Sequence, residues 1–265
     1  MRNELKYLVP SILLDELRNV ITHFAKPDKY SKLRGTRGYT IRSIYLDTPS
    51  LDFYIEKIEG YEKRRKLRIR GYNEGTLNES PVFLEIKRKE GAKIEKQRVQ
   101  VPYLAAASLL DCADPLGSIV PLMPSPQADA DMRAFLFHAR KRPMRPINLV
   151  VYEREAFEGH AEESLRLTLD KNLRAGLYPA MDGLYEEKGL YDVVPGHFIL
   201  EVKFDHFYPV WLRPFLSRHQ LKKQALSKYV MAIDRFDLTI GRRDQTIVSQ
   251  PTDIAVPLHT LTPLS

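Results

Sequence analysis

Positively charged side chains recur at every second position in several segments of this chain. In KLRIR at 66–70, basic residues alternate with Leu67 and Ile69. The same alternation occurs in FLEIKRK (83–89), LRLTLD (165–170) and ILEVKFD (199–205). Successive side chains of a strand point to opposite faces, so each segment places its charges on one side. If these sides converge, they form a concave surface rich in Lys and Arg with a few carboxylates, which suits a polyanion and a metal ion.

The most strongly basic region is predicted to be an antiparallel meander of residues 63–73, 81–90 and 93–101. One face of it would carry seven basic residues and one acidic residue, namely Lys66, Arg68, Arg70, Glu85, Lys87, Lys89, Lys96 and Arg98. The alternative is the solvated face of an ordinary antiparallel sheet. Like charges directly opposite one another destabilise a sheet, so we favour a face that a bound anion neutralises.

Further candidates lie on other predicted strands. Tyr152 and Arg154 share one face of a strand, and Arg166, Thr168 and Asp170 lie on another strand. The planar guanidinium of Arg suits phosphate. Glu4 and Lys6 share a face of the first strand, for which an ordinary solvated edge strand is the alternative.

Two more candidates have equally simple structural alternatives. Glu201, beside Lys203, is either an ion-pair partner or a ligand for Mg²⁺ or Mn²⁺, and the pattern alone leaves both open. Ser227 and Lys228 stand near the start of a predicted helix, where the N-terminus favours anions. The alternative for Lys228 is an exposed surface side chain.

The elements that must position these residues are mostly antiparallel strands with interspersed helices, which indicates an α+β fold. Strands are predicted at 3–9, 40–47, 63–73, 81–90, 93–101, 147–157, 164–170 and 197–205. Helices are predicted from Ser11 to about Phe24 and at 50–58, 103–112, 129–141, 209–217 and 222–236. We expect one domain over residues 1–240, followed by a polar, proline-containing tail at 241–265.

Composition narrows the class of protein. The 265 residues include 41 Lys and Arg against 34 Asp and Glu, a net charge of +7 that favours anionic partners without choosing among them. The single cysteine suits a reducing cytoplasm, and no apolar run is long enough to cross a bilayer. The chain lacks a P-loop, GxGxxG, CxxC or HExxH motif, and no His is assigned to catalysis.

Taken together, these segments resemble the VTC domain, the polyphosphate polymerase module of the triphosphate tunnel metalloenzyme (CYTH-like) superfamily. The motifs that carry the resemblance follow in order from residue 3 to about residue 236. They are NELKYLV at 3–9, SIYLDT at 43–48, KRRKLRIRGY at 63–72, FLEIKRK at 83–89, KQRV at 96–99, VYEREAF at 151–157, LRLTLD at 165–170, ILEVKF at 199–204 and SKY at 227–229.

This resemblance implies a closed antiparallel β-tunnel of about eight strands, with a charged interior and helices outside. It assigns contacts with the nucleoside triphosphate or the product chain to Lys6, Arg68, Arg70, Lys87, Arg154, Arg166 and Lys228. Tyr152 and Ser227 would add hydroxyl contacts, Lys96 would line the tunnel with Lys66 and Arg98 of the basic meander, and Glu201, with Glu4 as a second candidate, would hold Mn²⁺ or Mg²⁺.

The implied activity is transfer of the γ-phosphate of ATP to a growing polyphosphate chain. Arg2 occupies the first acidic position of the ExExK strand found in the hydrolases and cyclases of the superfamily, leaving Glu4 and Lys6. Fewer carboxylates favour transfer over hydrolysis. The alternatives are a tripolyphosphatase or nucleoside triphosphatase, and a non-catalytic module that binds polyphosphate, inositol phosphate or RNA. The expected partners are ATP and polyphosphate. Nucleic acid is not expected as a partner, since the basic strands carry few aromatic residues on the charged face for stacking on bases.

Overall fold

One antiparallel sheet organises the computed structural model, which describes residues 3–32, 38–73, 80–91, 93–110, 124–160, 162 and 164–237. Its strands are β1 (Asn3–Pro10), β2 (Ala25–Pro27), β3 (Tyr39–Asp47), β4 (Lys63–Tyr72), β5 (Pro81–Glu90), β6 (Lys93–Pro102), β7 (Arg145–Gly159), β8 (Arg166–Leu177), β9 (Tyr191–Asp192) and β10 (His197–Phe204). The helices are α1 (Leu14–Phe24), α2 (Lys29–Lys32), α3 (Asp52–Ile58), α4 (Tyr103–Leu110), α5 (Pro126–Arg140), α6 (Arg213–Arg218) and α7 (Lys228–Arg235), with short 3-10 turns at Ser11–Leu13, Met181–Tyr185 and Val210–Leu212. The predicted tail at 241–265 lies outside the described residues.

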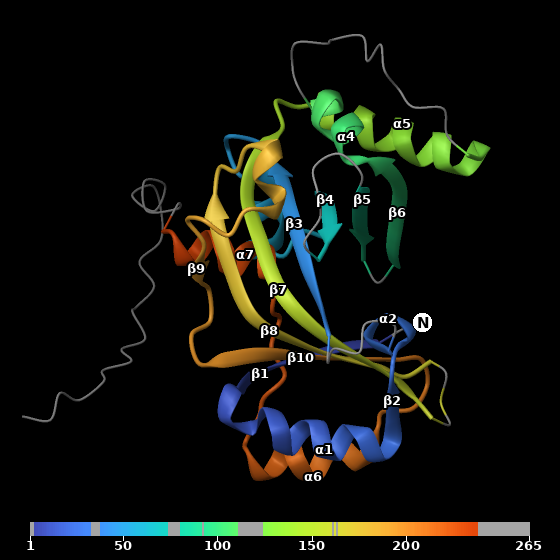
Figure 1. Cartoon of the computed structure of the whole chain (residues 1–265), viewed down its shortest axis with the longest axis vertical. Helices are drawn as coiled ribbons and strands as arrows, with labels where there is room; N and C mark the ends of the chain where they lie inside the picture. The colour runs from blue at the N-terminus through green and yellow to red at the C-terminus, as the bar shows by residue number, and fades with distance from the viewer. Residues whose placement is uncertain are drawn as a thin grey trace, which may run out of the picture.

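The strand order does not follow the chain. The hydrogen-bonded path runs β1-β10-β8-β7-β3-β4-β5-β6, with β2 added to β7 and β9 to β8. In Figure 1 the long strands β7 and β8 curve through the molecule and connect β3–β6 with the crossing strands β1 and β10. Among the described residues, no hydrogen bonds join β1 to β6, the two ends of this path. The α+β antiparallel fold is therefore confirmed, whereas hydrogen bonding does not close the sheet into a tunnel.

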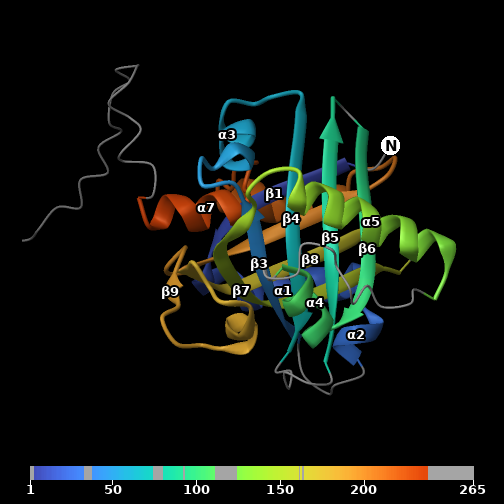
Figure 2. The same ribbon diagram turned by 90° about the horizontal axis from the view of Figure 1, so that it is seen from above.

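Helices cover the apolar face of the sheet, as the alternating sequence requires. Helices α4 and α5 lie over β4–β6 (Figures 1 and 2), where Leu67, Leu84 and Val99 pack against Tyr103 and Phe135. Helices α1 and α6 lie against β1, β8 and β10. Burial of apolar side chains stabilises these contacts, by about 1.5–3 kcal/mol for each large side chain. The charged side chains of the same strands therefore point to the opposite face.

This opposite face, which we call the inner face, is partly covered by α3 and α7. Tyr54 of α3 and Tyr229 and Ile233 of α7 join a cluster with Tyr45 and Val150 of the inner face. The buried carboxylate of Asp47, at the end of β3, accepts hydrogen bonds from the backbone N–H groups of Phe53 and Tyr54 at the start of α3. It also accepts from the neighbouring Thr48 N–H and from the Tyr229 hydroxyl. A single side chain thus fixes both helices beside the charged residues. No helix in the described part of the chain combines the length and apolarity needed to span a bilayer.

Candidate active site

Charged side chains of β4, β5 and β6 form two rows across the inner face. The register aligns Lys66, Lys87 and Lys96 in one row, which we call the lysine rung. It aligns Arg68, Glu85 and Arg98 in the next row, the arginine rung. Because like charges side by side are unfavourable in a sheet, the lysine rung is an arrangement that a polyanion would stabilise.

Glu85 is the central carboxylate of this region and is only 1% exposed. Its oxygens lie 2.6 Å from Arg68 Nε, 2.8 Å from Lys96 Nζ, 3.5 Å from Arg98 Nε and 3.7 Å from Arg70 Nε. Burial alone would raise the pKa of Glu85, but Arg68, Arg70 and Lys96 outweigh it and the pKa is lowered. One negative charge thus orders four cations and leaves most of their positive charge unbalanced.

A second cluster of charges lies on β7, β8, β10 and the start of α7. Arg154 donates two hydrogen bonds to the fully buried Asp170, at 2.6 and 2.7 Å, and Lys228 Nζ lies 2.5 Å from the same carboxylate. Glu201 Oε1 lies 2.8 Å from Lys203 Nζ, and its other oxygen lies 3.7 Å from Arg154 Nη2. Burial would raise the pKa of Glu201, but the surrounding lysines lower it well below the ordinary value.

Side chains from both parts of the sheet meet at one side of the inner face. Lys87 of β5 lies 3.9 Å from Glu4 of β1, and Glu4 also pairs with Lys6 at 2.9 Å. An ion pair therefore bridges the gap that backbone hydrogen bonds leave open. This contact brings the lysine rung next to the carboxylates of β1 and β10.

The N-terminus of α7 contributes directly to the same face. Ser227 caps the helix, and Lys66 Nζ donates a 2.6 Å hydrogen bond to the Ser227 hydroxyl. Lys6 donates to the Leu226 carbonyl at 3.1 Å. Burial, together with repulsion from Lys6 and Lys87, lowers the pKa of Lys66 well below its ordinary value. Burial likewise lowers the pKa of Lys87 and of Lys96.

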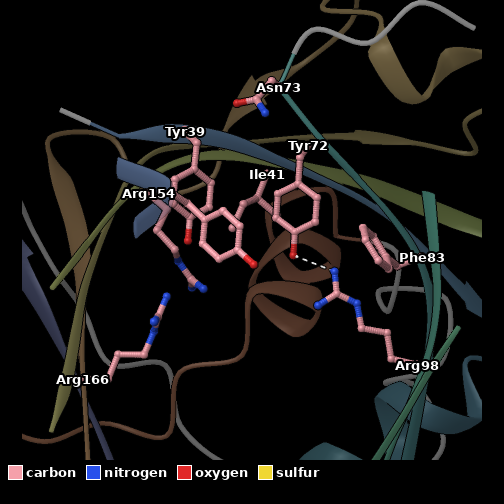
Figure 3. Close-up of a pocket in the computed structure, with 9 residues that line it drawn as sticks. Tyr39, Ile41, Tyr72, Asn73, Phe83, Arg98, Arg154 and Arg166 are labelled. Atoms are coloured by element: carbon pink, nitrogen blue, oxygen red, sulfur yellow. Dashed lines mark hydrogen bonds between the residues drawn. The ribbon is translucent and has the colours of Figure 1, made fainter. Parts of the chain in front are cut away.

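A cavity of about 590 Å³ opens at the end of the inner face that lies next to the arginine rung, away from the lysine rung (Figure 3). Its lining consists of Tyr30, Tyr39, Ile41, Tyr72, Asn73, Phe83, Arg98, Arg154 and Arg166. Burial raises the pKa of Tyr39 to about 12, so this phenol stays neutral at physiological pH. The expectation of few aromatic residues on the charged face is wrong at this end, although Tyr72 and Phe83 already lay in phase with Arg70 and Glu85 in the sequence.

The structure brings all fourteen sequence-predicted site residues to the inner face or its edge. Arg68, Arg70, Lys96 and Arg98 surround Glu85. The second cluster and the ion pairs beside it on β1 contain Glu4, Lys6, Lys87, Arg154, Glu201 and Lys228. Lys66 pairs with Ser227. Tyr152 lies under Lys228, whose Nζ is 4.6 Å from the ring centroid. Arg166 faces the cavity, but its guanidinium also pairs with buried Asp28 at 2.8 Å. The roles of these residues stay predictions. Sequence reasoning placed Glu85 and Asp170 among the candidate positions without giving either a role, and it did not single out Tyr45.

Glu201 and Glu4 are the carboxylates best placed to hold a divalent cation. They lie on the paired strands β1 and β10, where Glu4 is the register partner of Lys203 and Glu201 is that of Lys6. Beside them, the buried hydroxyl of Thr168, the register partner of Glu201, has no hydrogen-bond partner within the described part of the chain. Two carboxylates and a spare hydroxyl suit a hard cation that takes its other ligands from phosphate and water. The described residues contain no group of three or more His, Cys, Asp or Glu side chains arranged around a metal position.

Three solved structures are similar to this chain, and each comes from a protein described as a "putative" adenylate or adenylyl cyclase. The one from Hippeastrum, reported with a dominant triphosphatase activity, has a TM-score of 0.53 at 14% identity, covering 88% of this chain and 96% of its own. The protein from Vibrio parahaemolyticus has a TM-score of 0.43 at 13% identity, with coverage of 87% and 97%. The protein from Bacillus halodurans has a TM-score of 0.45 at 16% identity, with coverage of 88% and 96%.

Sequence comparison gives a more specific result. No curated protein matches the chain, but the VTC domain matches residues 1–236, which include every predicted site residue. The motif order from β1 to α7 had predicted this match. The chain belongs to the VTC domain family.

Proposed function

We propose that this protein is a polyphosphate polymerase, which transfers the γ-phosphate of ATP to a growing polyphosphate chain. The observation that carries the proposal is the surplus of cations on one partly enclosed face. Four cations surround Glu85, and one of them, Lys96, continues into a row with two further lysines, Lys66 and Lys87. This arrangement suits a substrate with several negative charges in a line, and the inner face would enclose that chain as a tunnel.

The ion pairing of the carboxylates supports transfer to a phosphate rather than to water. Glu85, Asp170 and Glu201 are all buried with lowered pKa values, because each contacts two or more cations. A general base works best when its pKa lies near the operating pH. These three carboxylates are therefore poorly suited to remove a proton from water, whereas an ionised terminal phosphate needs no base.

The proposed reaction is an in-line displacement. A terminal oxygen of the polyphosphate chain attacks the γ-phosphorus of ATP, the bond from that phosphorus to the β–γ bridging oxygen breaks, and ADP leaves with the electron pair. Catalysis of this kind is mostly positioning and stabilisation of charge. Arg68, Arg70 and Lys96 would hold the phosphates in line, ordered by Glu85. When bound at Glu201 and Glu4, Mn²⁺ or Mg²⁺ would supply neutralisation of the phosphate oxygens.

The main alternative is a tripolyphosphatase or nucleoside triphosphatase on the same face. The dominant triphosphatase activity reported for the Hippeastrum protein of similar fold favours it. A module that binds polyphosphate, inositol phosphate or RNA without turnover is the second alternative. We propose the cytoplasm as the compartment of the reaction, on the basis of the single cysteine.

The test is incubation of the purified protein with ATP and Mn²⁺ or Mg²⁺, with and without a short polyphosphate primer. Formation of acid-labile polymer with stoichiometric ADP supports polymerase activity. Release of free phosphate without polymer selects the triphosphatase, and ATP binding without turnover selects the binding module.

Arg68→Ala is the informative variant for this assay. It removes a charge-assisted contact worth roughly 1.5–3 kcal/mol, so turnover or ATP affinity should fall about tenfold or more. Arg133→Ala is the matched control, because Arg133 lies on the outer helix α5, is 76% exposed and pairs only locally with Asp129. Equal kinetics for the two variants would remove Arg68 from the site.

A further inference from the structure

Four aromatic rings form a row across one end of the inner face. Tyr30 of α2, Tyr39 of β3, Tyr72 of β4 and Phe83 of β5 follow one another with ring centroids 6.3, 6.1 and 5.7 Å apart. Tyr30 is 54% exposed, and the other three rings are half-buried. Aromatic surface left open to water is unfavourable, so a row that lines a cavity indicates a ligand with a flat apolar part.

Three guanidinium groups line the same cavity as these rings (Figure 3). The Arg98 guanidinium lies 3.5 Å from the Phe83 ring centroid, and its Nη2 donates to the Tyr72 hydroxyl at 3.3 Å. Arg154 and Arg166 point into the cavity from the opposite side. The volume of about 590 Å³ lies within the range of small-molecule sites. The walls thus combine stacking surfaces with positive charge.

The cavity and the lysine rung lie at different levels of the same strands. On β5, Phe83 faces the cavity, Glu85 belongs to the arginine rung and Lys87 to the lysine rung. Four residues, or about 14 Å, therefore separate the aromatic level from the lysine level. Phosphate has no flat apolar surface, so a ligand made only of phosphate would gain nothing from stacking on these rings.

We propose that this cavity binds the nucleobase and sugar of the phosphate donor, with the phosphates extending along β5 toward the lysine rung. The inference rests on the proposed function, in which the donor is a nucleoside triphosphate. Stacking tolerates any base because every base has a π-face. The lining includes one amide, Asn73, and is otherwise aromatic, aliphatic or Arg. The site therefore accepts different nucleoside triphosphates with similar affinity but discriminates against inorganic tripolyphosphate, which has no base.

The experiment measures binding without turnover, by calorimetry in the presence of a chelator. ATP, GTP and tripolyphosphate are compared on the wild type and on two separate variants, Tyr39→Leu and Phe83→Leu. The affinity for ATP and GTP should fall about 5- to 140-fold, as expected for the loss of one stacking contact. The affinity for tripolyphosphate should change less than twofold. Tyr191→Leu is the control, since Tyr191 is an exposed ring on β9 outside the cavity.

Three results would overturn the inference: equal loss of ATP and tripolyphosphate affinity, wild-type tripolyphosphate binding as tight as ATP binding, or preferential binding of a single-stranded oligonucleotide. Thermal melting of each variant separates loss of a contact from loss of the fold, and the two variants provide independent tests. Failure of the polymerase proposal alone would appear as absence of polymer, with the selectivity for nucleotides and its loss in the variants unchanged.

Discussion

Replacing Glu85 by Gln should lower the stability of the fold and, at the same time, raise the affinity for polyanions. The substitution keeps the shape of the side chain but removes the charge that balances Arg68, Arg70, Lys96 and Arg98. Removing one partner of a buried ion pair costs about 3–5 kcal/mol. For a chain of this size, the corresponding fall in Tm is roughly 6–20 °C.

A bound polyanion would supply the missing negative charge. If saturating tripolyphosphate removes half of a 3 kcal/mol loss, thermodynamic linkage requires the variant to bind tripolyphosphate about tenfold more tightly than the wild type. Melting curves across a range of tripolyphosphate concentrations, together with direct calorimetry, measure both quantities on the same samples.

Glu155→Gln is the matched control. Glu155 is also a buried carboxylate, but it lies on the outer face of β7, where it pairs with Arg18 and Lys171 at 2.8 and 2.7 Å. It should lower Tm comparably without changing the affinity for tripolyphosphate. If Glu85→Gln binds tripolyphosphate no more tightly than the wild type, the view that Glu85 orders an anion site is refuted.

Three further predictions concern the lysine rung, the metal position and α7. The pKa of Lys66 lies below its ordinary value of 10.5, so Lys66 loses its charge at a lower pH than a free lysine does. As the pH is raised, the affinity for tripolyphosphate should therefore decrease before pH 10.5 is reached. Lys66→Arg should prevent much of that decrease in a pH titration of binding. Glu201→Gln should raise the Mn²⁺ concentration needed for half-maximal turnover at least tenfold, and an unchanged metal titration would remove Glu201 from the metal site. Tyr229→Phe leaves a buried oxygen of Asp47 without its hydroxyl donor, which should cost about 1–3 kcal/mol in urea unfolding, and an unchanged midpoint would contradict that account.

The regular alternation of charged and apolar residues made the main strands predictable. β1, β3–β6 and β10 agree with their predicted ranges to within one residue at either end. The helix predicted at 222–236 begins only at Lys228, where Ser227 caps α7. The second half of β8 was missed because Lys171 and Asn172 interrupt the pattern. Asn172 has a φ of 50°, and the β7–β8 register shifts nearby. Such an irregularity is visible only once the partner strand is known.

The arrangement of the site depended on information that the sequence does not contain. Glu85 was recognised as the one acid among seven basic residues, but its four ion pairs follow from the register of β4–β6. The aromatic row joins residues of one helix and three strands, so no single segment displays it. The contact between Glu4 and Lys87 likewise required the curvature of the whole sheet.

The pairing of β1 with β10 also has a consequence for how the chain folds. Lys6 and Glu201 are register partners although they stand near opposite ends of the described chain. β1 must therefore wait for the synthesis of β10 before it gains this partner, and such non-local pairing slows folding. Glu4 and Glu201 come together in this same event. Chains that end before β10 would thus lack the proposed metal position, because Glu4 would have no Glu201 beside it.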